Sequence, residues 1–117
     1  MASKAITNVG RNAIRDFLQG EISTIGVGTD GSDVSTTDTT LGNEVLSKAS
    51  ANQDVGDGSE QFEIRLLTSE ANNLDLRELG LLTPADELYF RLVFAEIPKT
   101  SDFEVEFEVT ATVQNPE

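Results

Sequence analysis

The segment Phe103-Glu104-Val105-Glu106-Phe107-Glu108-Val109-Thr110-Ala111-Thr112-Val113 decides the fold class. Apolar side chains occupy every odd position, and glutamate or threonine occupies every even one. Successive side chains of a β-strand point to opposite faces, so this spacing predicts a strand with one face toward a core and one toward solvent. The three glutamates on the solvent face also protect a sheet edge from wrong pairing.

Earlier segments show the same alternation. Residues 62–67 alternate in this way, residues 74–82 form an extended segment broken by Pro84, and residues 21–28 and 41–50 are two further extended elements. In the run 88–95, Leu88, Phe90, Leu92 and Phe94 share one face and the residues between them share the other. Several strands joined by Gly/Asp/Ser turns predict a mainly β chain, an antiparallel, jelly-roll-like β-sandwich spanning about residues 21–114.

One amphipathic helix is predicted over residues 7–19, capped by Thr7 or Asn8 and ended by Gly20. We expect it on the outside or at one end of the sandwich. The polar tract 29–40 predicts an exposed loop, residues 51–59 a turn region, and Asn72-Asn73 a turn. No repeat or linker divides the chain, so residues 1–117 are expected to form a single domain.

Composition excludes several classes of function. The chain has no cysteine and no histidine, which removes thiolate metal sites and the commonest general base near neutral pH. With 21 Asp+Glu against 8 Lys+Arg, the net charge of −13 argues against nucleic-acid binding. No apolar run is long enough to enter a membrane, and the N-terminus lacks the apolar stretch of a signal peptide, so synthesis in the cytoplasm is expected.

The acidic balance also predicts adaptation to molar salt. Only three lysines occur, Lys4, Lys48 and Lys99. At molar salt the Debye length falls to about 3 Å, so that dense carboxylates repel one another little. The alternative is an ordinary acidic protein, in which the same charges would strain the compact state.

No motif predicts an enzyme or a bound cofactor. Gly26-Val27-Gly28-Thr29-Asp30-Gly31 lacks the Gly-Lys-Ser/Thr ending of a phosphate loop, so a turn is the preferred interpretation. Three equivalent glutamates on one strand do not form the unlike carboxyl pair of a glycosidase. The candidate cation ligands, for Ca²⁺ or Mg²⁺, are Asp30, Asp33, Asp54 and Asp57, with solvated turn carboxylates as the alternative.

The order of segments resembles a family of small tailed-phage structural modules, described as tail-fibre, collar or baseplate-associated proteins. The matching motifs are Ile25-Gly26-Val27-Gly28-Thr29, residues 37–45, residues 62–68, Glu78-Leu79-Gly80-Leu81, residues 88–100 and the strand 103–113. In that family the Gly-x-Gly-Thr motif ends a strand in a turn. The departures are the Asp-rich loop and the glutamate-rich last strand, both of which fit a salt-loving host.

The resemblance implies a virion structural protein, a subunit of the tail at the baseplate or a fibre attachment. Its expected partners are other virion proteins and further copies of itself, in a trimer or hexamer. The alternatives are a capsid decoration or turret protein and a host-surface module that binds carbohydrate or ions. The candidate contact residues are Ile14, Phe17, Leu18, Leu67, Tyr89, Arg91 and Val93, with ordinary core packing as the alternative, above all for the helix face.

Overall fold

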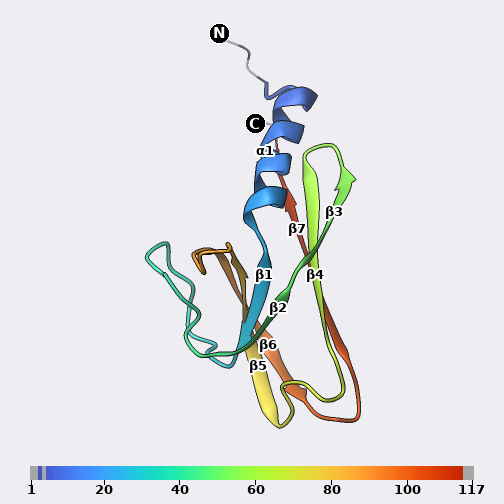
Figure 1. Ribbon diagram of the computed structural model, residues 1–117. Coiled ribbons are helices and arrows are strands. Elements are labelled where there is room, and N and C mark those ends of the chain that lie inside the picture. Colours follow the sequence, from blue (N-terminus) through green and yellow to red (C-terminus); the bar gives the residue numbers. More distant parts are fainter. Residues whose placement is uncertain (1–2, 4, 115–117) are drawn as a thin grey trace.

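The computed structural model describes residue 3 and residues 5–114, and folds them into one helix and two antiparallel sheets (Figure 1). The elements are α1 (Asn8–Glu21), β1 (Thr24–Gly28), β2 (Glu44–Ala49), β3 (Ala51–Gly56), β4 (Ser59–Leu66), β5 (Leu74–Leu82), β6 (Leu88–Lys99) and β7 (Val105–Thr112). The strand orders are β2-β1-β5-β6 and β3-β4-β7. The prediction of a mainly β sandwich with one N-terminal helix is therefore confirmed. Residues 1, 2, 4 and 115–117 of the predicted domain, including part of the N-terminal stretch, lie outside the described residues.

The core lies between the two sheets and follows the two-residue period of the strands. Phe62, Ile64 and Leu66 of β4 are buried beside Ile25 and Val27 of β1. Leu79 and Leu81 of β5 complete this layer, because they pair directly with Val27 and Ile25 in the neighbouring strand. Every second side chain of each strand thus points into the same space.

The last strand alternates as predicted. Val105, Phe107, Val109 and Ala111 are half-buried and pack against the core, whereas the glutamates and threonines between them are exposed. Phe107 contacts Phe94 of β6, with ring centroids 5.4 Å apart. Phe103 precedes the strand and stays partly exposed.

Helix α1 stands at one end of the sandwich and contributes no fully buried residue (Figure 1). Thr7 caps it as predicted, since its side-chain oxygen accepts the N–H of Gly10. The predicted end at Gly20 is wrong, because the helix continues to Glu21 and stops at Ile22, whose side chain turns into the core. Among the described residues, no helix is long and apolar enough to cross a membrane.

The prediction of a turn over residues 51–59 is also wrong. Residues 51–56 form β3, which pairs with β4, and the turn occupies only residues 57–58. β3 lies at the edge of its sheet, and five of its six residues are exposed. Polar residues can therefore form this strand, because its backbone hydrogen bonds to β4 hold it in place without the burial of apolar side chains that the inner strands have.

Candidate functional site

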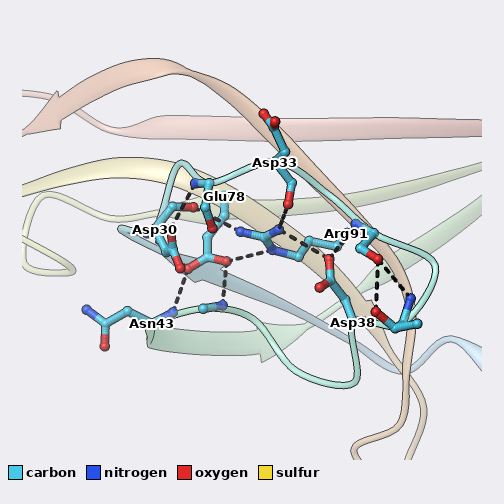
Figure 2. A network of polar contacts seen from close by, with 10 residues as sticks. Asp30, Asp33, Asp38, Asn43, Glu78 and Arg91 are labelled. Atoms are coloured by element: carbon cyan, nitrogen blue, oxygen red, sulfur yellow. Dashed lines mark hydrogen bonds and ion pairs between the residues drawn. The ribbon is translucent and has the colours of Figure 1, made fainter.

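The most extensive polar network of the molecule joins Glu78 of β5 to Arg91 of β6, on the outer face of the four-stranded sheet (Figure 2). Arg91 Nε lies 3.0 Å from Glu78 Oε1. The Glu78 side chain is 0% exposed and the Arg91 side chain 5% exposed. This is a buried ion pair.

The pair fastens the 29–43 loop, which connects β1 to β2. Glu78 accepts three backbone N–H groups of the loop: from Gly42 at 2.8 Å, from Asn43 at 2.7 Å and from Asp30 at 3.1 Å. Arg91 donates to the carbonyl oxygens of Asp30 and Asp33 and to the carboxylate of Asp38. The two side chains thus replace the regular hydrogen bonding that the loop lacks.

Two glycines make room for this arrangement. A Cβ atom at Gly28 would collide with the Glu78 carboxylate and the Asn43 carbonyl oxygen, and one at Gly42 would collide with the Asp30 carboxylate. The predicted extended element over residues 21–28 is confirmed for residues 24–28, so Gly26 and Gly28 lie within β1. The turn interpretation of residues 26–31 is wrong for these two glycines, whose missing side chains let the loop approach the sheet.

The surroundings of Glu78 keep it ionised, so that its charge can hold the 29–43 loop. Burial opposes ionisation, but the N–H groups of Asn43, Gly42 and Asp30, together with Arg91, outweigh it and lower the pKa of Glu78. With four donors around its two oxygens, Glu78 stays ionised and has little capacity to accept a proton from another molecule. The arrangement is suited to holding the 29–43 loop in one conformation.

The candidate cation ligands fall into two separate places. Asp30 and Asp33 lie in the 29–43 loop, whereas Asp54 lies in β3 and Asp57 in the turn between β3 and β4. The Asp30 carboxylate accepts the N–H of Ser32, which lowers the pKa of Asp30. The Asp54 carboxylate pairs with Arg15 at 3.0 Å and accepts the N–H of Gly56. The carboxylates of Asp30 and Asp54 thus already form hydrogen bonds or ion pairs within the chain.

A different set of carboxylates comes together on the outer face of the three-stranded sheet. Within residues 3 and 5–114, the one group of three close enough to share an ion is Glu63, Glu106 and Glu108. Glu63 joins the other two because it lies opposite Glu108 in the β4–β7 register. The group is largely exposed, and Glu106 pairs with Arg65. Sequence analysis placed Glu106 and Glu108 on a solvated face and missed Glu63, which only the pairing of β4 with β7 adds.

The candidate contact residues differ in how much surface they present. Ile14, Phe17, Leu67, Tyr89 and Val93 are exposed, and Leu18 is half-buried against the core. Arg91 does not offer its guanidinium to another protein, because Glu78 and the 29–43 loop enclose it.

Sequence analysis missed the exposure of Phe90 and Leu92. Their face was expected to be the core face of β6, and they do lie beside Leu81 and Leu79 on that face. They remain 41% and 39% exposed, because β6 is the outermost strand of its sheet. Glu78 was missed as well, since nothing in the sequence distinguishes it from Asp75 and Arg77, the other charged residues of the segment 74–82.

Compared with known proteins, the chain matches no protein-family model. No curated protein matches it either.

Proposed function

We propose that this chain is a non-enzymatic structural subunit of a virus particle that acts by assembling with copies of itself and with neighbouring virion proteins. The observation that carries the proposal is the number of large apolar side chains that the folded chain leaves at its surface. Those at least 37% exposed among the described residues are Val9, Ile14, Phe17, Val34, Val55, Leu67, Tyr89, Phe90, Leu92, Val93 and Phe103. Four of them, Tyr89, Phe90, Leu92 and Val93, are near neighbours on β6, and clustered apolar surface is typical of a protein–protein contact.

The shape of the molecule supports the same role. The described residues extend over 55 × 27 × 26 Å, with a radius of gyration of 15.9 Å. A compact domain of this length would have a radius of gyration of about 13 Å. An elongated subunit has more surface per residue available for contacts with neighbours.

A non-catalytic role agrees with the chemistry of the polar network. Its central carboxylate is saturated by hydrogen bonds, and its arginine is enclosed. Both groups are used to fix a loop, which defines a surface.

The position in the tail, at the baseplate or a fibre attachment, rests on the resemblance of the ordered sequence motifs to tailed-phage modules. Locating the chain in purified particles by electron microscopy would test it. A handful of copies at the tail is the expected result, whereas hundreds of copies on the head would mean a capsid decoration protein.

Assembly itself is tested on the purified chain by sedimentation equilibrium in molar KCl. We expect one oligomer of defined size that dissociates on desalting, because the net charge of −13 per copy is then no longer screened. A monomer at every protein and salt concentration would contradict the proposal.

A further inference from the structure

The edge strand β6 differs in composition from the rest of the chain. Residues 88–95 contain no carboxylate, although the chain has 21 Asp+Glu. β6 is the last strand of its sheet and pairs with β5 alone. Among the described residues, no backbone hydrogen bond joins residues 88–98 to a segment other than β5. One side of this strand therefore has unpaired N–H and C=O groups.

Both faces of the same edge are apolar and exposed. Phe90 and Leu92 pair with Leu81 and Leu79 on the inner face, and Val93 pairs with Glu78 on the outer face. Tyr89 lies at the register shift between Leu88 and Phe90, and each of the four side chains is 37–41% exposed. We call these four residues the β6 strip. The single charged side chain among residues 88–95, Arg91, is occupied by Glu78 and the 29–43 loop.

The other three edge strands carry charged residues. β7 has Glu106 and Glu108 on its exposed face, β2 has Glu44 and Lys48, and β3 has Asp54. Charged side chains prevent the edges of sheets from pairing with other chains. On β6, apart from the enclosed Arg91, residues that oppose pairing appear only after the strip. These are the charged Glu96 and Pro98, which lacks an N–H group, and they limit any added strand to residues 88–95.

We infer that the β6 strip is the contact through which a second copy of this chain binds, with the two β6 strands paired antiparallel across a two-fold axis. This deepens the proposed assembly function and rests on it. An added strand must present apolar side chains on both faces, and the same segment of a second copy does so. In an antiparallel pair, opposite residues point to the same face, so the inner faces of the two copies join and the outer faces join.

Charge also favours a second copy at this place. Each copy has a net charge of −13, so most contacts between copies would bring carboxylates together. The strip itself has no carboxylate, and the acidic groups that act on it, Glu21 and Glu87, lie at its Tyr89 end. Two copies can therefore approach at Leu92 with less of that repulsion. A two-fold contact buries the same patch on both partners and produces assemblies with an even number of copies. A dimer or a hexamer fits this contact, whereas a trimer alone does not.

The register of the pair follows from the limits of the strip. The centre of residues 88–95 lies between Arg91 and Leu92, and Leu92 is the inner-face residue nearest to it. We therefore expect Leu92 to lie opposite Leu92 of the second copy, with side chains about 5 Å apart at Cβ.

The first test is the variant Leu92→Lys, studied by sedimentation equilibrium in molar KCl. Placing an ammonium group in the apolar pair should raise the dissociation constant at least about tenfold. The added lysine makes the chain less negative, so that general repulsion cannot explain a loss of association. Thr110→Lys is the matched control, since Thr110 is exposed on β7 and lies outside the strip. Circular dichroism and thermal melting show whether each variant is folded.

The second test uses a variant that keeps the β6 strip uncharged, and it detects contact between two copies directly. The chain has no cysteine, so Leu92→Cys introduces the sole thiol. We expect a short bis-maleimide to cross-link this variant into a dimer, and Thr110→Cys to remain uncross-linked.

The outcomes separate the two proposals. A wild-type chain that is monomeric under all conditions overturns the assembly function together with the β6 contact. An oligomer that survives in folded Leu92→Lys, or a Leu92→Cys chain that assembles without cross-linking, overturns the β6 contact alone.

Discussion

Two glutamates of this molecule are both fully buried, yet their surroundings differ. Glu78, beneath the 29–43 loop, is surrounded by three backbone N–H groups and by Arg91. Glu60 of β4 lies at the end of the sandwich where α1 packs, and neither of its carboxylate oxygens has a hydrogen bond of regular geometry. Burial raises the pKa of Glu60, an effect that Arg15 and the Gln19 side chain partly offset and that Asp54 and Asp16 reinforce.

A segment can therefore have regular secondary structure and still be weakly attached to the rest of the fold, whereas an irregular segment can be firmly attached. A buried carboxylate stabilises its surroundings only where donors replace the lost water. The irregular 29–43 loop meets that condition through Glu78. The regular helix α1 contributes no fully buried side chain and covers a carboxylate to which it gives no regular hydrogen bond. We therefore expect α1 to be the more weakly held of the two regions.

The largest expected effect comes from Glu78→Gln. The substitution keeps the size of the side chain but leaves the buried guanidinium of Arg91 without its partner charge. Loss of one member of a buried ion pair costs about 3–5 kcal/mol. Urea unfolding in molar KCl measures this change, and a loss below about 1 kcal/mol would mean that the loop does not depend on Glu78.

Glu60→Gln is expected to act in the opposite direction. Removing a buried charge that has no hydrogen bond of regular geometry should raise the free energy of unfolding at pH 7 by about 1–3 kcal/mol. The same urea unfolding measures it. A destabilised variant would show that ionised Glu60 has a partner in solution, such as an ordered water.

The two substitutions also differ in pH dependence. The pKa of Glu60 is raised above its ordinary value of 4.5, so its favourable contribution is complete below pH 4.5 and is lost as the pH rises through the folded pKa. The pKa of Glu78 is lowered below 4.5, so its contribution is complete above pH 4.5 and is lost as the pH falls through the folded pKa. As the pH is lowered from 7, Glu60→Gln should converge with the wild type first, while Glu78→Gln remains destabilised to a lower pH.

Thr7→Ala tests the attachment of α1 at its other end. Loss of the cap on the Gly10 N–H should destabilise the helix by about 1 kcal/mol. In hydrogen exchange, the amides of the first turn should exchange faster, while those of Gly42 and Asn43 in the 29–43 loop stay unchanged. Equal acceleration in both regions would mean that helix and loop open as one unit.

The smallest effect is expected for Glu106→Gln. Glu106 is exposed and forms a surface ion pair with Arg65 at 3.1 Å. Such pairs contribute about 0.2–1 kcal/mol, so the variant should unfold almost as the wild type does. It is also the matched control for the two buried positions, and a loss as large as that of Glu78→Gln would remove the distinction between buried and surface carboxylates.

Much of the fold was predictable from local pattern. The alternation at residues 62–66 and 105–111, the extended segment 74–82 and the cap at Thr7 all agree with the structure. The failures have a common cause. β3 was missed because an edge strand needs little apolar burial. Gly26 and Gly28 were placed in an extended element but also interpreted as part of a turn, because the approach of the 29–43 loop that requires them is a long-range event.

The candidate site was predicted in part. Tyr89 and Val93 were identified as exposed because they lie opposite the apolar face of their strand. Phe90 and Leu92 were not, since their exposure depends on the position of β6 at the edge of its sheet. Arg91 was placed at the surface because nothing near it in sequence indicates the distant Glu78.

The sequence by itself determined that this protein is a β-sandwich with one helix and an acidic surface, because a period of two, a capping residue and a charge balance are local or additive properties. Which strands lie at the edges of the sheets is known only from the tertiary structure. The same holds for which glutamates are buried with hydrogen-bond donors around them and which are buried without. Those outcomes depend on strand order and on contacts between residues far apart in the chain, and no local pattern encodes them.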